Sequence, residues 1–154
     1  KKKSTVRLQG AGDRLLDMKH PPDGSKLPKK YFYIAKGFHT LFCERKGYTK
    51  TLKSASAEKW TDDVRKLVEL DKVTIEQLVA IKMCWDAINQ GERGLDPFWL
   101  DTVHSMAAFR HKTKNDVYYW DMIVEKVKGW AEDPKNVAQV HKKVKAYKKY
   151  VGIN

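Results

Sequence analysis

KKYFYIAKGFHTLFCERK, residues 29–46, has the clearest helical period in the chain. Its apolar side chains recur every three or four residues, which is the spacing of one face of an α-helix. These side chains are Tyr31, Ile34, Ala35, Phe38, Leu41 and Phe42. Gly47 follows directly and is a natural stop for a helix, because glycine accepts the backbone conformation that ends many helices. The sequence therefore predicts a helix that begins at Lys29 and buries one face.

Further helices are predicted downstream, each behind a residue that can cap its first turn. Thr74-Ile75-Glu76-Gln77 matches a capping box, in which the Thr74 hydroxyl and the Gln77 side chain satisfy each other's backbone N–H groups. The Asp-Pro pairs at 96–97 and 133–134 combine an N-cap carboxylate with a proline in the first turn. The predicted starts are Ser56, Thr74, Asp96, Ser105, Asn115 or Asp116, and Asp133.

The fold predicted from these segments is all-α. No run alternates with the period of two that marks a strand, and no turn dipeptide joins two β-rich runs. We expect a compact bundle of six or seven helices packed around Trp60, Trp85, Trp99 and Trp120. Residues 1–28 should form a basic arm with one short helix around 14–19, residues 29–133 the helical core, and residues 134–154 a basic amphipathic helix. Residues 48–55 are predicted to be a loop.

Charge is segregated along the 154 residues, whose formal net charge is +12. Residues 1–50 hold thirteen Lys and Arg against four acids, residues 51–133 twelve against fifteen, and residues 134–154 six Lys and no acid. A mildly acidic, aromatic-rich middle therefore separates two basic ends, where Lys1–Lys3 begin the first. Local positive potential of this kind attracts a polyanion, and nucleic acid is the leading specific partner.

Composition also bears on compartment and on catalysis. Cys43 and Cys84 lack metal or redox spacing and fall at apolar positions, as expected of small buried thiols in a reducing, cytoplasmic setting. No stretch approaches the roughly 20 apolar residues that span a bilayer, so no membrane is expected as a partner. The five histidines show no metal-ligand pairing, and no phosphate loop, nucleophile elbow or Cys–His arrangement is recognised. We therefore expect no enzyme, no metal and no cofactor.

The segment from Tyr31 to Val127 resembles the C-terminal helical domain of phage and plasmid replication-initiation proteins, replisome organisers of the DnaD/DnaT-like primosomal kind. The pattern that carries the resemblance is Ala35-Lys36-Gly37-Phe38, Lys59 to Leu67 running to Asp71, Thr74 to Gln77, Trp85, Asp96-Pro97-Phe98-Trp99, Ser105, Phe109-Arg110 and Trp120-Asp121. Such proteins carry a DNA-binding winged helix ahead of this domain, and nothing here corresponds to it. The resemblance thus implies single-strand DNA binding or contact with a helicase or primosome partner, in a bacterial or phage-infected cell, and does not extend to origin recognition.

The C-terminal helix is the sharpest candidate site. Valines and one tyrosine form its apolar stripe, and lysines cover much of the rest. These lysines are Lys135, Lys142, Lys143, Lys145, Lys148 and Lys149. A basic amphipathic helix can follow phosphates, lie on an anionic membrane or enter a partner's groove. The stripe lacks the Trp, Phe or Leu usual at a membrane, so phosphate contact and a merely packed, lysine-solubilised helix remain the two interpretations.

A second candidate comprises Lys29, Lys30, Tyr33 and Lys36. The helical period places Tyr33 off the apolar stripe and between lysines, where its ring could stack on an unpaired base. The alternative, which the pattern favours, is a half-buried tyrosine covered by lysine stems.

A third basic cluster comprises Arg110, Lys112 and Lys114, which could contact phosphates where a short helix ends. Alternatively, Arg110 pairs with an acid such as Asp121 inside the bundle, and its aromatic surroundings favour that role.

The sequence thus predicts a non-catalytic accessory domain that binds nucleic acid, most specifically single-stranded DNA, through lysine-rich faces. The rival class is a protein-interaction module, in which acidic side chains dock a basic partner or the last helix enters a partner's groove. Its acidic residues would be Asp62, Asp63, Glu69, Asp71, Glu76 and Asp86. A helical subunit of an RNA-containing effector complex would use the same lysine faces, so the sequence does not separate DNA from RNA.

Overall fold

The structure is a computed structural model that describes residues 13–22 and 24–153, so the predicted contribution of Lys1–Lys3 lies outside the described residues. The described chain forms seven α-helices and two short 3₁₀ helices, and no strand. The helices are η2 (Leu15–Asp17), α2 (Lys29–Lys46), α3 (Lys50–Lys53), α4 (Ala57–Glu69), α5 (Ile75–Asn89), α6 (Phe98–Thr102), η3 (Ala107–Arg110), α7 (Tyr119–Glu132) and α8 (Pro134–Val151). The predicted all-α bundle is confirmed.

Most predicted helix starts are confirmed, because the capping chemistry is local. α2 begins at Lys29 and ends at Lys46, and its C-cap is Gly47, whose φ of 78° favours a residue without a side chain. Ser56 accepts a hydrogen bond from the Lys59 N–H at 3.2 Å and opens α4. The Thr74 capping box is complete, with both of its hydrogen bonds made at 2.9 and 3.0 Å. Asp133 caps α8 through the Lys135 N–H at 3.0 Å.

Three predicted boundaries are wrong for physical reasons. α6 begins at Phe98 with Pro97 as its N-cap, so the predicted cap at Asp96 is one residue too early; the Asp96 carboxylate accepts from the Phe98 N–H at 3.0 Å ahead of the helix. Residues 48–55 are not only a loop, because the Thr49 hydroxyl accepts from the Leu52 N–H and starts the short helix α3. α7 begins at Tyr119 rather than behind Asn115 or Asp116. The Thr113 hydroxyl captures the N–H groups of Asn115 and Val117 in a turn, and the Tyr119 N–H donates to the His111 carbonyl. These local bonds compete with a helix there.

The core surrounds α2, which packs against α4 and α5. Phe38 lies at its centre, with its ring 5.4 Å from that of Phe109 and 6.1 Å from that of Trp85. Trp60 and Trp85 are buried as predicted, whereas Trp99 and Trp120 are only half-buried at the edge of the core. Leu15 and Met18, from the predicted arm, are also buried, so this part of the arm packs onto the bundle.

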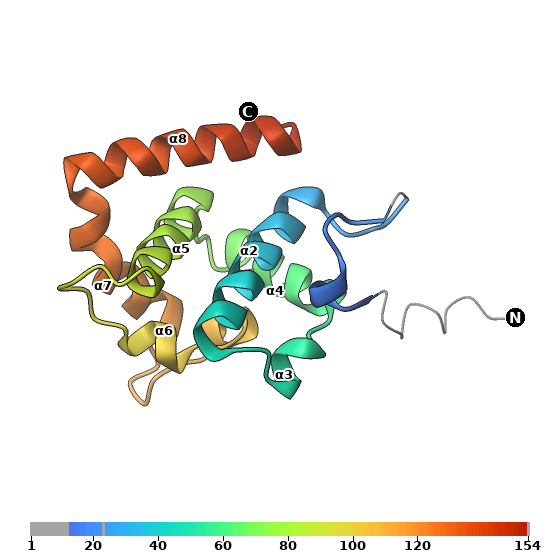
Figure 1. The fold of residues 1–154 in the computed structure, drawn as a ribbon, viewed down its shortest axis with the longest axis horizontal. Helices are drawn as coiled ribbons and strands as arrows, with labels where there is room; N and C mark the ends of the chain where they lie inside the picture. The colour runs from blue at the N-terminus through green and yellow to red at the C-terminus, as the bar shows by residue number, and fades with distance from the viewer. Residues whose placement is uncertain (1–12, 23, 154) are drawn as a thin grey trace, which may run out of the picture.

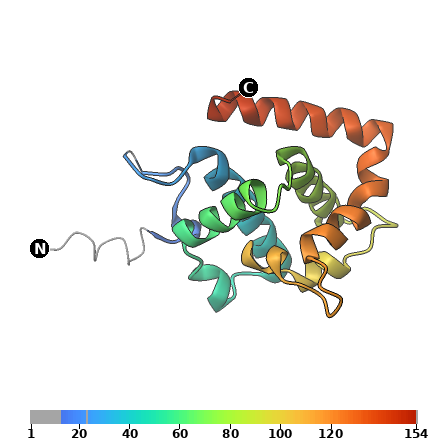
Figure 2. The same ribbon diagram turned by 180° about the vertical axis from the view of Figure 1, so that it is seen from behind.

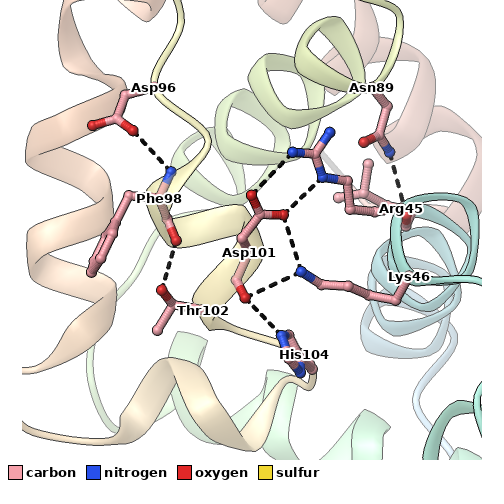
Figure 3. Close-up of polar contacts among 9 residues, drawn as sticks. Arg45, Lys46, Asn89, Asp96, Phe98, Asp101, Thr102 and His104 are labelled. Carbon is pink, nitrogen blue, oxygen red and sulfur yellow. Dashed lines mark hydrogen bonds and ion pairs between the residues drawn. The ribbon is translucent and has the colours of Figure 1, made fainter.

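Hydrogen bonds and ion pairs to Asp101 connect α6 to the end of α2 (Figure 3). Arg45 donates to its two carboxylate oxygens at 2.8 and 3.1 Å, and Lys46 donates at 3.0 Å. These hydrogen bonds, led by that from Arg45, lower the pKa of Asp101 to about 2. The cluster therefore ties the loop-rich segment around α6 to the central helix.

α8 lies along one side of the molecule, across α5 and over the start of α2 (Figures 1 and 2). Asp133 ends α7 and caps α8, so the chain turns a corner there with no linker. At the other end of α8 the Tyr147 hydroxyl donates to the Lys30 carbonyl. Both ends of α8 are therefore attached to the bundle.

Candidate nucleic-acid interface

The inner face of α8 holds the helix on the bundle. Val140 and Val144 are each 6% exposed and pack on Ala80, with Val79 and Met83 beside them. These contacts form a small apolar cluster separate from the main core. Because the apolar stripe is used in this way, the lysines between its members are left facing solvent.

Lysines at a seven-residue spacing define the outer face of α8. Lys135, Lys142 and Lys149 are each two helical turns apart, or about 10.5 Å along the axis, and all three are exposed. Lys145 is exposed beside them. α8 contains no acidic residue, and in the described part of the chain its one ion pair is between Lys148 and Glu76, at 3.7 Å. We call Lys135, Lys142, Lys145 and Lys149 the outer lysine face.

Two hollows flank α8. The polar hollow, of about 580 Å³, lies between α8 and the start of α5 and is lined by Lys145, Lys148, Lys149, His141 and Glu76. The apolar groove, of about 440 Å³, lies between α2, α5 and α8. Its lining includes Tyr33, Phe38, Met83, Tyr147 and Tyr150, with Lys82 and Lys143 also contributing. Positive charge therefore lies beside an apolar, tyrosine-rich surface.

The residues predicted at the start of α2 have different environments. Lys29 is exposed, and the Lys30 ammonium lies 5.1 Å from the centre of the Tyr31 ring. Lys36 is not a free ligand for phosphate, because its ammonium donates to the Leu15 carbonyl and burial lowers its pKa. The hydrogen bond from Tyr147 to the Lys30 carbonyl brings the start of α2 beside the C-terminal part of α8, so Lys29 and Lys30 lie near the Lys145 and Lys149 end of the outer lysine face.

Tyr33 is half-buried, as the sequence favoured. Its ring meets Tyr150 edge-on at 5.1 Å, and its hydroxyl shares a 2.8 Å hydrogen bond with His20. Burial raises the pKa of Tyr33 to about 12. Tyr33 therefore forms part of the wall of the apolar groove and is not a freely exposed stacking ring.

The third basic cluster is largely neutralised and lies apart from α8. Arg110 is held by Asp71, not by Asp121 as predicted, in a two-pronged ion pair of 2.7 and 3.0 Å. Lys112 pairs with Asp116 at 3.2 Å, whereas Lys114 is exposed on the same loop. This loop lies at the opposite side of the bundle from α8 (Figures 1 and 2). The twelve predicted residues therefore do not form one continuous surface.

The acidic residues that the rival interpretation would use to bind a basic partner are all either buried or already paired with basic side chains. Asp63 is buried, and Asp71 holds Arg110. The other four carboxylates are paired: Asp62 with Arg65 and Lys66, Glu69 with Arg65 and the Tyr31 hydroxyl, Glu76 with Lys148, and Asp86 with Lys82. They offer little unpaired negative charge to a basic partner.

A Cys–His contact that the sequence analysis missed lies inside α2. Cys43 Sγ is 3.7 Å from His39 Nε2, which itself donates to the Leu52 carbonyl at 2.8 Å. Burial lowers the pKa of His39 and raises the pKa of Cys43, so both are neutral near pH 7. The i,i+4 spacing was the available signal. The hydrogen bond from His39 to the Leu52 carbonyl joins α2 to α3, so the role of His39 is structural.

Within residues 13–22 and 24–153, no group of three His, Cys, Asp or Glu side chains is placed to hold a metal ion. None of the helices described is both long enough and apolar enough to cross a bilayer. Comparison of the chain with family models, with curated proteins and with solved structures gave no match. The resemblance to replication-initiation domains therefore rests on the sequence pattern alone.

Proposed function

We propose that this protein is a nucleic-acid-binding accessory domain that holds phosphates on the outer lysine face of α8. The observation that carries the proposal is a helix with six lysines and no acid, docked on the bundle by one face, with four lysines on the other that form no ion pair within residues 13–22 and 24–153. Lys29 and Lys30 add positive charge near the C-terminal end of this helix. The sequence resemblance supports DNA replication initiation or helicase loading as the setting.

Electrostatics explains why such a face is suited to a polyanion. Each lysine that neutralises a phosphate releases condensed counterions, which favours binding at low salt. The lysines are displayed on a helix that is already folded and docked, so binding does not have to fold it first. A protein partner for the acidic residues is less well supported, because those carboxylates are already paired or buried.

The test is a titration of fluorescent oligonucleotides at several salt concentrations. Lys142, Lys145 and Lys149 are changed together to Gln. The matched control changes Lys50, Lys53 and Lys114 to Gln, which removes the same charge from exposed positions away from α8. The α8 variant should lose most of its affinity, and its log–log salt slope for single strands should fall by about 2, since each phosphate neutralised contributes about 0.7. Equal losses in both variants, or no binding by the natural chain, would refute the proposal.

A further inference from the structure

The lining of the apolar groove beside α8 includes two small residues. Gly37 on α2 and Ala146 on α8 both line it. A Cβ at Gly37 would lie 3.5 Å from the Lys82 side chain, so the missing side chain keeps this part of the groove open. At about 440 Å³ the groove falls within the range of roughly 300–1,000 Å³ typical of small-molecule sites. It is therefore large enough for a flat ring.

Tyrosines give the groove its aromatic character. Tyr147 and Tyr33 line it, and Tyr150 stands on its edge with 60% of its surface exposed. Tyr33 meets Tyr150 edge-on at 5.1 Å, so the two rings already lie side by side at the groove. Aromatic side chains stack on any base, because every base has a π-face.

The groove is continuous with the outer lysine face. Ala146 lines the groove and lies one helical turn from both Lys142 and Lys149 of the outer face, at the i,i+4 and i,i+3 spacings that place side chains side by side on a helix. The positive charge at the groove comes from Lys143, because Lys82 is neutralised by Asp86 at 2.8 Å. A ligand that suits both surfaces has an anionic chain for the lysines and a flat apolar group for the groove.

We propose that the apolar groove takes an unstacked base of a single-stranded nucleic acid whose phosphates lie on the outer lysine face. This inference rests on the proposed function and narrows its substrate to single strands, since the bases of a duplex are stacked and paired and cannot enter. The lysines supply attraction that is independent of base, and the groove supplies the preference for exposed bases.

Three probes of one length separate the two proposals: a single-stranded oligothymidylate, its abasic analogue with the same phosphates, and a duplex. The oligothymidylate should bind about ten-fold more tightly than the abasic strand, as expected if one base stacks on an aromatic side chain. Tyr150→Ala and Gly37→Leu should lower oligothymidylate affinity to that of the abasic strand and leave abasic affinity unchanged. Tyr150→Phe keeps the ring and should bind like the natural chain.

Each contrary result has a distinct meaning. Equal binding of all three probes, unaffected by the groove variants, would overturn the groove assignment and leave the lysine face intact. Failure of every probe to bind would refute the proposed function itself. Sedimentation of the free protein tests a second copy as the occupant: a dimer that Gly37→Leu dissociates would also overturn the inference. Circular dichroism of each variant shows whether the fold is retained.

Discussion

Arg110 and Asp71 form the ion pair whose removal should be most costly to stability. The guanidinium grips both carboxylate oxygens at 2.7 and 3.0 Å. The Asp71 side chain is only 5% exposed, whereas that of Arg110 is 27% exposed. The pair joins the turn after α4 to η3, two segments separated by 39 residues. We therefore expect removal of the cation to lower the free energy of unfolding much more than neutralisation of the anion does.

Arg110→Met removes the cation and leaves a buried carboxylate without a partner. Breaking a buried pair in this way costs about 3–5 kcal/mol, and partial exposure of Arg110 favours the lower end of that range. Asp71→Asn leaves a partly exposed cation that can still donate to the amide oxygen, and should cost about 1–2 kcal/mol. Because a domain is stable by about 5–15 kcal/mol in total, the first change should be readily measured.

Urea unfolding at pH 7, followed by tryptophan fluorescence, measures the loss for each variant and for the double variant. The double variant should lose less than the sum of the single losses, because the two side chains interact directly. Oligonucleotide affinity, measured where the variants remain folded, should not change. A loss below about 1 kcal/mol for Arg110→Met would contradict the buried-pair reasoning. If Arg110→Met weakened oligonucleotide binding as much as the α8 lysine variant does, Arg110 would have to be counted as a phosphate ligand.

Three other changes test the packing. The pKa of His39 lies below its ordinary value of 6.5 because the ring is buried, so the unfolded chain takes up the proton first. The free energy of unfolding should therefore fall as the pH drops from 7 towards 5, and His39→Gln should flatten that dependence in urea titrations. Asp101, with a pKa of about 2, should add stability that is lost between about pH 4 and 2. Because the Asp101 side chain is half-exposed, this contribution to the free energy of unfolding should be about 1 kcal/mol. Asp101→Asn should abolish the contribution and its dependence on pH. Gly37→Ala should raise stability by about 0.5–1 kcal/mol in thermal unfolding, because Gly37 is helical and the added methyl meets only ordinary contacts. A lower melting temperature for this variant would contradict the geometry.

Helix starts were predictable because each depends on residues within one turn of the chain. Ser56, Thr74 and Asp133 all make the capping bonds that their sequence positions indicate. The start of α7 was mispredicted because Thr113 binds the same backbone groups that a helix would need. Whether this segment forms a helix start or the Thr113 turn depends on a small difference in free energy between them, which residue spacing in the sequence does not indicate.

Long-range partners were much harder to predict. The sequence indicated an ion pair for Arg110 but not that its partner follows α4. It also suggested two separate basic ends, whereas Tyr147 on α8 bonds to the Lys30 carbonyl across 117 residues of chain. The apolar groove requires three helices to be placed together, and no spacing within one segment indicates it.

The small cluster beneath α8 has a consequence for local unfolding. Val140 and Val144 are the buried residues of α8, and they rest on Ala80 outside the main core. The other contacts of the helix, such as the Lys148–Glu76 ion pair and the edge-on Tyr150–Tyr33 pair, involve partly exposed side chains. Segments with few buried apolar contacts open at a lower free energy than the core does. Amide hydrogens of α8 should thus exchange with solvent faster than those of α2. A bound polyanion should slow this exchange more in α8 than in any other described helix.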